Sequence, residues 1–334
     1  MVDDVAQGLP KAARNAMPAS AGGTRSQRPE EDSIDVACPL CGAPGSTTWL
    51  LRGEWRYRKC AACSSVWLDP LPSEAWAEDF YDHGYFEGGG RGGYRDYLAD
   101  EAQHLANARA RIELASRFGA TSPGLWLDVG CATGYTLVEA RNAGFDVCGV
   151  DVSPWARSVA GERFKLDVYA TLSDAAHQHA GQASVVTMFQ VLEHLPDPIA
   201  ALKQARACLQ PGGLLLIESW DRASLVARLF GRHWQQISPP SVVWLFDRAS
   251  IDTLLIRAGF DRRAILATAK AVSVGWACGL LADKLPAGFA PVLAGIASSR
   301  LGRVDIDYRL GDLVTVIAVA RAAQYGRSDH DSER

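Results

Sequence analysis

Four cysteines near the N-terminus have the spacing of a metal site. Cys38 and Cys41 form one C-x2-C pair, Cys60 and Cys63 form a second, and 18 residues separate the pairs. Two such turns can deliver four thiolates tetrahedrally to one Zn²⁺. Because the protein supplies all four ligands, the site is closed, and we expect a structural zinc that folds its own module. An iron–sulfur cluster and unliganded thiols are the two alternatives.

A glycine turn and an acid follow two apolar runs further along the chain. LWLDV (125–129) leads directly into GCATG, where Gly130 and Gly134 let the backbone turn sharply at the end of a strand. FDVCGV ends at Asp151, 21 positions after Gly130. A carboxylate at such a strand end can accept both hydroxyls of a ribose. The pattern therefore predicts a nucleoside-binding edge, and the alternative for Asp151 is a cap on the helix that follows.

The loop after a later apolar run carries a candidate general base. SVVTMFQ (184–190) runs into VLEHLPDP, so Gln190 falls at a strand end, on the edge predicted for Gly130, and we expect it to line the same site. His194 is the candidate base because histidine titrates near neutrality. The alternative is that this loop is braced, with Glu193 accepting backbone N–H groups and His194 packing beneath a proline.

The elements that must position these residues alternate between strand and helix. Short apolar runs separated by helical patterns predict βαβ units on a parallel sheet, and hence an α/β fold. Asp247 and Gly259 have the positions of an N-cap and a C-cap for one amphipathic helix. Another helix begins at Pro198 and ends before a Pro-Gly-Gly turn at 211–213. The predicted strands are 125–129, 145–150, 184–190, 214–220, 263–268 and 313–320.

Composition and spacing divide the chain into five segments. Hydrophobic residues make up 48% and charged residues 22% of the sequence, which is ample for a buried core. The terminal segments are polar and aperiodic, and we expect both to be disordered. The boundaries are a tail at 1–34, a zinc-ribbon-like module at 35–70, an aromatic and glycine-rich connector with a helix at 71–122, a main domain at 123–322, and a tail at 323–334.

Charge and termini limit the partners and the compartment. The formal net charge is −4 and the isoelectric point about 6.0, so no global basic field attracts nucleic acid. The first twenty residues include acids and no apolar run, which does not fit a signal peptide. We therefore expect a cytoplasmic protein with reduced cysteines.

The glycine turn has the spacing D-x-G-x-x-x-G, which resembles the first motif of class I S-adenosylmethionine-dependent methyltransferases. The resemblance continues through GVDVSPWA (149–156), FQVLEHLPDP (189–198), PGGLLLIES (211–219) and AGF (258–260), and LVTVIAVA fits the antiparallel last strand of that family. It implies a Rossmann-like seven-stranded methyltransferase sheet, S-adenosyl-L-methionine as cofactor and methyl transfer as the activity.

The resemblance also assigns residues. It places Asp128 beside the amino group of the donor and Asp151 on its ribose hydroxyls. It implies no residue for adenine, because VYATLSD (168–174) offers only Asp174, which comes too late. The donor-binding set that follows is Asp128, Gly130, Cys131, Ala132, Gly134, Asp151, Val152 and Gln190.

A zinc ribbon ahead of this pattern resembles methyltransferases that modify sugars. It implies transfer to oxygen or carbon of a small molecule, a sugar or glycan-linked acceptor. The aromatic connector (67–97) resembles the same subgroup, as either a mobile flap or a packed interface. Quinone or phenol O-methyltransferases, which FQVLEHLPDP also resembles, are an alternative acceptor class. So are ribosomal-RNA methyltransferases, favoured by four cations near the cysteines: Arg52, Arg56, Arg58 and Lys59.

Two further features complete the prediction. Related chains often carry a histidine where this one has PPSVVWLF (239–246). Outside the enzymes, the alternative function is a non-catalytic regulator that binds the donor. An insertion at 269–311 precedes the last strand and contains two uncharged runs, 271–282 and 285–299. Intramolecular packing, a homodimer contact and peripheral membrane contact through 271–299 are all consistent with it.

Overall fold

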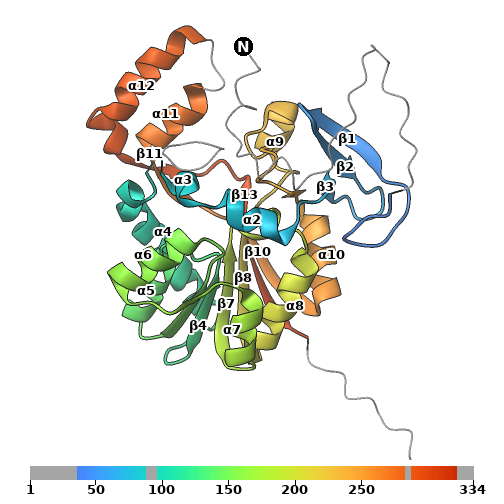
Figure 1. Cartoon of the computed structure of the whole chain (residues 1–334), viewed down its shortest axis with the longest axis vertical. Coiled ribbons are helices and arrows are strands. Elements are labelled where there is room, and N and C mark those ends of the chain that lie inside the picture. Colours follow the sequence, from blue (N-terminus) through green and yellow to red (C-terminus); the bar gives the residue numbers. More distant parts are fainter. Residues whose placement is uncertain (1–35, 88–95, 283–286, 322–334) are drawn as a thin grey trace, which may run out of the picture.

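The structure, a computed structural model, describes residues 36–87, 96–282 and 287–321. The tails expected to be disordered, 1–34 and 323–334, both lie outside the described residues. Figure 1 shows a central sheet with helices on both sides, a small sheet beside it and a helical hairpin that projects from one end.

The central sheet has seven strands in the order β10-β13-β8-β7-β4-β5-β6. β13 pairs antiparallel with both β10 and β8, and the pairs among β8, β7, β4, β5 and β6 are parallel. This arrangement confirms the predicted α/β methyltransferase sheet. The strands are β4 (Leu125–Val129), β5 (Asp146–Val150), β6 (Val168–Tyr169), β7 (Ala183–Phe189), β8 (Leu209–Trp220), β10 (Phe260–Ala267) and β13 (Leu313–Ala320).

Two strands begin clearly earlier than the sequence predicts, since β10 begins at Phe260 and not at 263, and β8 begins five residues early. β8 starts at Leu209, so the turn expected at 211–213 is part of the strand. The register is irregular there, because Ala183 faces Leu209 while Val185 faces Leu214. A Cβ on Gly213 would lie 2.9 Å from the carbonyl oxygen of Ala183. The glycines therefore let the chain enter the sheet through a bulge.

Helices cover both faces of the sheet (Figure 1). One face carries α4 (Glu101–Arg117), α5 (Tyr135–Asn142) and α6 (Pro154–Phe164), and the other carries α7 (Leu172–Gln178), α8 (Pro198–Cys208) and α10 (Arg248–Ala258). The predicted caps of α10 are confirmed, since the Asp247 carboxylate accepts the N–H of Ser250 and Gly259 is left-handed. The predicted start of α8 at Pro198 is also confirmed.

The cysteine module, residues 36–70, does not form its sheet alone. Its strands β1 (Thr47–Arg52), β2 (Trp55–Lys59) and β3 (Val66–Asp69) are joined by β9 (Trp244–Leu245), which comes from the main domain. The side chains of Tyr57 and Trp67 are buried in the same hydrophobic cluster as Trp244. The module therefore shares a core with the main domain.

The connector crosses the end of the sheet where the parallel strands terminate (Figure 1). It contains α2 (Glu74–Phe80), α3 (His83–Phe86) and the short helix η3 (Leu98–Asp100). Residues 88–95 of this aromatic connector lie outside the described residues. Further short helices are η4 (Leu192–His194), α9 (Leu225–Phe230) and η5 (Gly231–His233).

The insertion folds as a two-stranded root and a hairpin of apolar helices. β11 (Lys270–Ser273) pairs with β12 (Asp305–Tyr308), and between them lie α11 (Val274–Ala282), η6 (Ala287–Phe289), α12 (Ala290–Ser298) and η7 (Leu301–Arg303). We call α11 and α12 the insertion hairpin. No helix in the described ranges is both long and apolar enough to cross a membrane.

Candidate active site

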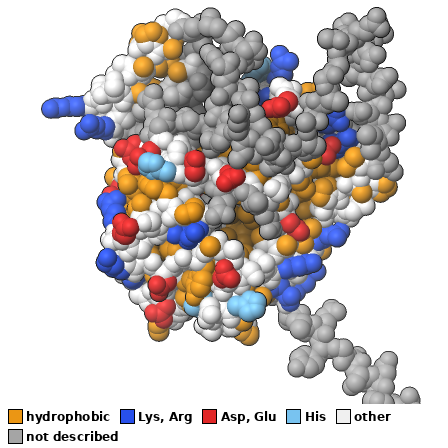
Figure 2. Space-filling model, viewed as in Figure 1, with side chains coloured by type: hydrophobic (Ala, Val, Ile, Leu, Met, Phe, Trp, Pro, Cys, Tyr) orange, Lys and Arg blue, Asp and Glu red, His pale blue; other side chains and the backbone are white. Residues whose placement is uncertain are grey.

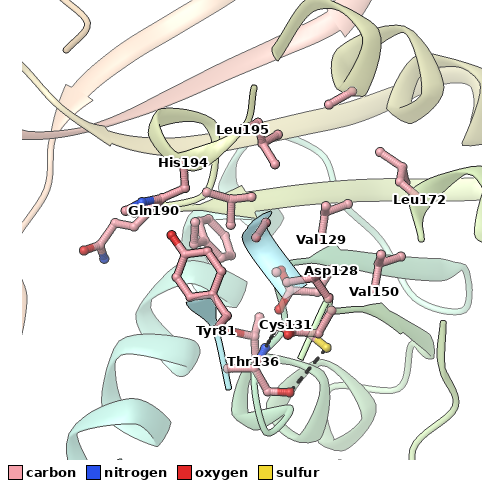
Figure 3. A pocket seen from close by; sticks show the side chains of 18 of the residues that line it. Tyr81, Asp128, Val129, Cys131, Thr136, Val150, Leu172, Gln190, His194 and Leu195 are labelled. Carbon is pink, nitrogen blue, oxygen red and sulfur yellow. Dashed lines mark hydrogen bonds between the residues drawn. The ribbon is translucent and has the colours of Figure 1, made fainter. Parts of the chain in front are cut away.

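A cavity of about 530 Å³ lies at the ends of the parallel strands. In Figure 3, Asp128, Cys131 and Val150 lie together on one side, Gln190 and His194 lie on the other, and Tyr81 stands between them in this view. The predicted donor residues that line it are Asp128, Gly130, Cys131, Ala132, Asp151, Val152 and Gln190, and the predicted base His194 lines it as well. Gly134 is not among the lining residues.

The two turn glycines are required by the surrounding protein. Gly130 has φ +70, and a Cβ there would lie 2.4 Å from a methyl group of Val191. Gly134 has φ +93, and its Cβ would lie 2.3 Å from a methyl group of Leu166. Protein side chains therefore occupy the space that a Cβ would need, and the left-handed backbone would strain any other residue at these two positions.

Asp151 holds the glycine turn together. Its carboxylate accepts the N–H of Ala132 at 2.7 Å and the N–H of Ser153 at 2.9 Å. The first bond keeps Ala132 in a left-handed conformation, φ 48. Burial raises the pKa of Asp151, while these two N–H groups act against the rise. Each carboxylate oxygen has a second lone pair, so the group can still accept hydroxyls from the cavity.

Asp128 is a buried acid at the end of β4. Its side chain is 3% exposed, and one oxygen accepts the hydroxyl of Thr187 at 2.6 Å. Burial raises its pKa to about 7, although Thr187 and the nearby Arg111 act in the opposite direction. A buried carboxyl of this kind gains stability from a cation placed beside it.

The segment after β6 forms a mixed wall on the donor side. Ala170 and Leu172 line the cavity there, together with the hydroxyl residues Thr171 and Ser173, while Val152 and Leu195 add apolar surface. Asp174 is not among the lining residues and instead accepts the hydroxyl of Thr171 at 2.7 Å. The segment after β6 therefore contributes no acid to the described lining of the cavity.

Gln190 is fixed at the end of β7 by Glu218. Gln190 has φ 59, a strained conformation for this residue type, and its N–H donates to the Glu218 carbonyl oxygen at 2.7 Å. Its side-chain amide donates to a Glu218 carboxylate oxygen at 2.8 Å. Arg111 forms a bidentate pair with the same carboxylate, at 2.6 and 3.1 Å. Burial opposes ionisation of Glu218, but Arg111 and Lys270 lower its pKa below the usual value.

Lys270 brings a second cation into the cavity from the root of the insertion. Its ammonium donates to the side-chain oxygen of Gln190 at 3.2 Å. Asn107 on α4 fixes the next residue, because its amide both donates to and accepts from the backbone of Ala271, at 3.0 and 2.7 Å. Burial lowers the pKa of Lys270 to about 8, against the attraction of Glu218.

His194 is held in one orientation by a main-chain carbonyl. Its Nδ1 lies 2.6 Å from the carbonyl oxygen of Ser241, so Nδ1 carries the proton and donates it. Nε2 then keeps its lone pair and is the ring nitrogen available to the cavity. Burial lowers the pKa of His194, which favours the neutral ring. The segment that replaces the expected histidine, 239–246, therefore supports the histidine that is present.

Glu193 is a buried acid that is not among the residues lining the cavity. Its side chain is 3% exposed, and one carboxylate oxygen accepts the hydroxyl of Ser219 at 3.1 Å. Burial raises its pKa to about 7. Its main-chain carbonyl accepts the N–H of Val243 at 2.7 Å. The carboxylate bond thus comes from a side-chain hydroxyl, whereas the bracing role considered for Glu193 would have its carboxylate accept backbone N–H groups.

Aromatic rings form the remaining wall. Tyr81, Tyr85 and Phe86 from the connector line the cavity, as do Tyr97 and Phe189. The ring of Tyr81 meets that of His194 edge to face, with centroids 6.0 Å apart. The connector thus contributes aromatic side chains to the site.

The four predicted metal ligands lie together beside the main domain. All four sulfur atoms lie within 4.8 Å of one another, with 3.7 Å between Cys38 and Cys63 and 3.6 Å between Cys41 and Cys60. Four thiolates at ~2.3 Å from a tetrahedral zinc lie about 3.8 Å apart. The spacing therefore suits such an ion.

One of the four cations near the cysteines is not available to a nucleic acid. Arg58 is 1% exposed, and its guanidinium pairs with Asp69 at 2.5 Å. One of the four cations in the nucleic-acid alternative is thus structural, which weakens that alternative.

The functional residues that sequence reasoning missed are Arg111, Glu218 and Lys270. A lone acid in the apolar run LLLIESW was a usable signal for Glu218, because a buried charge needs a partner. Arg111 lies in a helix rich in charge, and Lys270 precedes an uncharged run, so neither had a local signal.

Comparison with known proteins places this arrangement in a family. The profile of a methyltransferase domain family matches residues 98–264, half of the chain. A ubiquinone biosynthesis O-methyltransferase of Psychrobacter arcticus is 30% identical over 159 residues, covering 42% of this chain and 60% of that protein. One from Aromatoleum aromaticum is 33% identical over 102 residues, covering 29% and 44%.

The chain spans about half the length of the curated relatives that it matches. Among solved structures, a SAM-dependent methyltransferase from Thermotoga maritima is similar with a TM-score of 0.45 and 16% identity, covering 67% of this chain and 93% of that one.

Proposed function

The chain belongs to the methyltransferase domain family, and on that premise we propose that it transfers a methyl group from S-adenosylmethionine to an oxygen of a quinone-type phenol. The observation that carries this proposal is the setting of His194. Its Nδ1 is committed to Ser241, and its Nε2 serves an aromatic-walled cavity that continues to Asp128 and Asp151.

The donor side of the cavity fits S-adenosylmethionine. The donor supplies an electrophilic methyl group on a sulfonium. Asp151 would accept the ribose hydroxyls, and the buried Asp128 would face the amino group, where a cation offsets its burial. Val152 and Leu172 would hold the adenine between apolar walls. Gln190, fixed by Glu218, would lie between donor and acceptor.

The acceptor side favours a flat aromatic molecule. Tyr81, Tyr85 and Phe86 offer ring faces and edges to it. Two of the relatives named above are ubiquinone biosynthesis enzymes, which agrees with a phenol and not with the sugar acceptor of the first interpretation. His194 would remove the hydroxyl proton at Nε2, because a phenol reacts through its oxygen anion.

Lys270 and Arg111 would orient the acceptor. The Lys270 ammonium uses one donor on Gln190, and its remaining N–H groups would bind a second ring oxygen. Arg111 is tied to Glu218 and would keep that carboxylate ionised and Gln190 in place. In-line alignment of acceptor and methyl group is the main requirement of this reaction.

The test pairs binding with turnover. Calorimetry of the pure protein with S-adenosylmethionine should show binding, and labelled donor should methylate a catechol-type quinone precursor but not a nucleotide sugar or ribosomal RNA. Transfer to the sugar alone would return the acceptor to the first interpretation. Donor binding without transfer to any of these would favour the non-catalytic regulator.

We also propose that the four cysteines bind one structural Zn²⁺. Support comes from the sulfur separations of 3.6 and 3.7 Å and from the shared core of the module. Metal analysis of purified protein should give one zinc per chain, and Cys60→Ser should lose it. Iron and acid-labile sulfide in place of zinc would contradict this assignment.

For the insertion hairpin we propose contact with a lipid surface. Phe289 and Val292 are 54% and 61% exposed, and Arg300 and Arg303 lie exposed at the following turn. Figure 2 shows hydrophobic side chains near the projecting end, with cationic side chains beside the helices. The protein should float with anionic vesicles, and Val292→Asp should reduce flotation. A homodimer in light scattering that Val292→Asp separates, without vesicle binding, would replace this proposal with the dimer.

A further inference from the structure

We infer that the cysteine module is a positioning element for His194, acting through residues 238–246, which we call the bridging segment. The inference rests on the proposed role of His194 as the base. The module itself contributes no residue to the described lining of the cavity, which begins in sequence at Ala77. Any effect of the module on the reaction must therefore pass through another element.

The module binds the bridging segment along its length. β3 pairs antiparallel with β9, with Val66 facing Leu245 and Trp67 facing Trp244. The N–H of Leu68 donates to the carbonyl oxygen of Val243 at 2.8 Å. These main-chain bonds fix the register of the segment, since a sheet ladder cannot slide by one residue without reversing its side chains.

A tyrosine of the module holds the main-chain carbonyl that follows the Ser241 carbonyl. The hydroxyl of Tyr57 donates to the carbonyl oxygen of Val242 at 2.5 Å. Tyr57 is fully buried, and burial raises its pKa, so the hydroxyl keeps the proton that it donates. The adjacent carbonyl, that of Ser241, accepts from His194 Nδ1.

The bridging segment in turn holds the whole loop around His194. The N–H of Val243 donates to the carbonyl of Glu193, and the indole N–H of Trp244 donates to the carbonyl of Leu195 at 2.9 Å. Residues 193, 194 and 195 each have one bond to the segment. The chain of contacts from the cysteine module to the base is therefore continuous.

This arrangement decides which ring nitrogen of His194 is basic. The Ser241 carbonyl selects the tautomer with a proton on Nδ1, and that leaves the lone pair of Nε2 for the acceptor. If the bridging segment moved, the Ser241 carbonyl would no longer select this tautomer, and Nε2 would lose its alignment with the acceptor hydroxyl. A misplacement of about 1 Å is enough to reduce turnover about 10²-fold.

The test uses Tyr57→Phe, which removes one hydrogen bond and keeps the ring. Nitrogen-15 NMR of the His194 ring should show the Nδ1–H tautomer in the wild-type protein and a mixture in Tyr57→Phe. We expect kcat to fall about tenfold while the donor Kd and the acceptor KM stay unchanged. In a His194→Asn background the same substitution should have no further effect on kcat, because the two residues act as one unit.

Two controls separate positioning from loss of stability. Ser46→Ala removes a bond inside the module, from its hydroxyl to the carbonyl of Val36 at 2.7 Å. Arg257→Ala removes a contact from α10 to the carbonyl of Cys41 at 3.0 Å, away from the bridging segment. Both should leave the tautomer and kcat unchanged. Trp67→Phe, which alters packing against Trp244, provides a second test variant.

An unchanged His194 tautomer with unchanged kcat in both Tyr57→Phe and Trp67→Phe would overturn the inference. So would an equal loss of kcat in Arg257→Ala or Ser46→Ala. The NMR measurement needs no substrate. A failure of the methyltransferase proposal, seen as no donor binding, is therefore distinguishable from a failure of the positioning inference.

Discussion

The donor half of the cavity, formed around Asp128, Ala132 and Asp151, is assembled from residues that are close in sequence. The acceptor half, formed around His194 and Lys270, gathers residues from distant elements. Asp128 lies at the end of β4 and Ala132 in the turn that follows it, and Asp151, which follows β5, accepts the N–H of Ala132. His194 depends on a carbonyl 47 positions away, and Lys270 reaches Gln190 across 80 positions. The donor half depends on the βαβ units of the sheet. The acceptor half depends on the segments added to them, namely the connector, the bridging segment and the root of the insertion.

The difference teaches where specificity is located. The donor half needs only a turn at the end of one strand and an acid at the end of the next, so it can be common to many acceptors. The acceptor half combines the connector, the bridging segment and the root of the insertion. We therefore expect substitutions in the two halves to separate donor affinity from turnover.

The largest expected effect lies in the acceptor half. His194→Asn keeps a side-chain N–H that can bond the Ser241 carbonyl, but it removes the Nε2 lone pair. We expect kcat to fall about 10²- to 10³-fold, because a general base is lost. Steady-state kinetics and calorimetry should show this fall with the donor Kd unchanged. Turnover close to wild type would remove His194 from the mechanism.

The second largest expected effect lies in the donor half. Asp151→Ala removes the acceptor of the ribose hydroxyls and of two turn N–H groups, and we expect the donor Kd to rise about 10²-fold. Asp174→Asn is the matched control, since Asp174 follows the neighbouring strand and is not among the residues lining the cavity. If calorimetry gave the same Kd for Asp151→Ala and wild type, the donor would not bind at this edge.

The pH dependence of donor binding tests the role of Asp128 in the donor half. Burial raises the pKa of Asp128 to about 7, so the carboxyl is largely protonated below that pH and cannot pair with the donor's ammonium. We expect affinity to fall about tenfold for each pH unit below 7 and to level off above it. Calorimetry across this range measures the slope. Asp128→Asn should bind weakly with a flat profile, and an equally steep profile in that variant would exclude Asp128 as the titrating group.

The smallest expected effect tests the boundary between the halves. Lys270→Met keeps much of the volume of the side chain and removes its charge, and we expect the acceptor KM to rise about tenfold because one hydrogen bond to a charged group is lost. The donor Kd should stay the same in calorimetry. A weakened donor Kd with an unchanged acceptor KM would move Lys270 to the donor half and break the comparison.

Much of the fold was predictable because its signals are local. The apolar runs, the caps at Asp247 and Gly259, and the cysteine spacing all depend on residues a few positions apart. The early start of β8 was not, because the bulge depends on how Leu209 meets Ala183 across the sheet. Gly134 was assigned to the donor, yet its missing Cβ accommodates Leu166.

The sequence by itself determined the central sheet, the glycine turn and the acid after it, since chain connectivity forces consecutive parallel strands to end at one edge. Only the tertiary structure decided that β9 joins the cysteine module, that Ser241 holds His194, and that Arg111, Glu218 and Lys270 meet beside Gln190. These are contacts between main-chain atoms or between charges far apart in sequence. Their formation depends on burial and on register between segments, which no local pattern of residue types encodes.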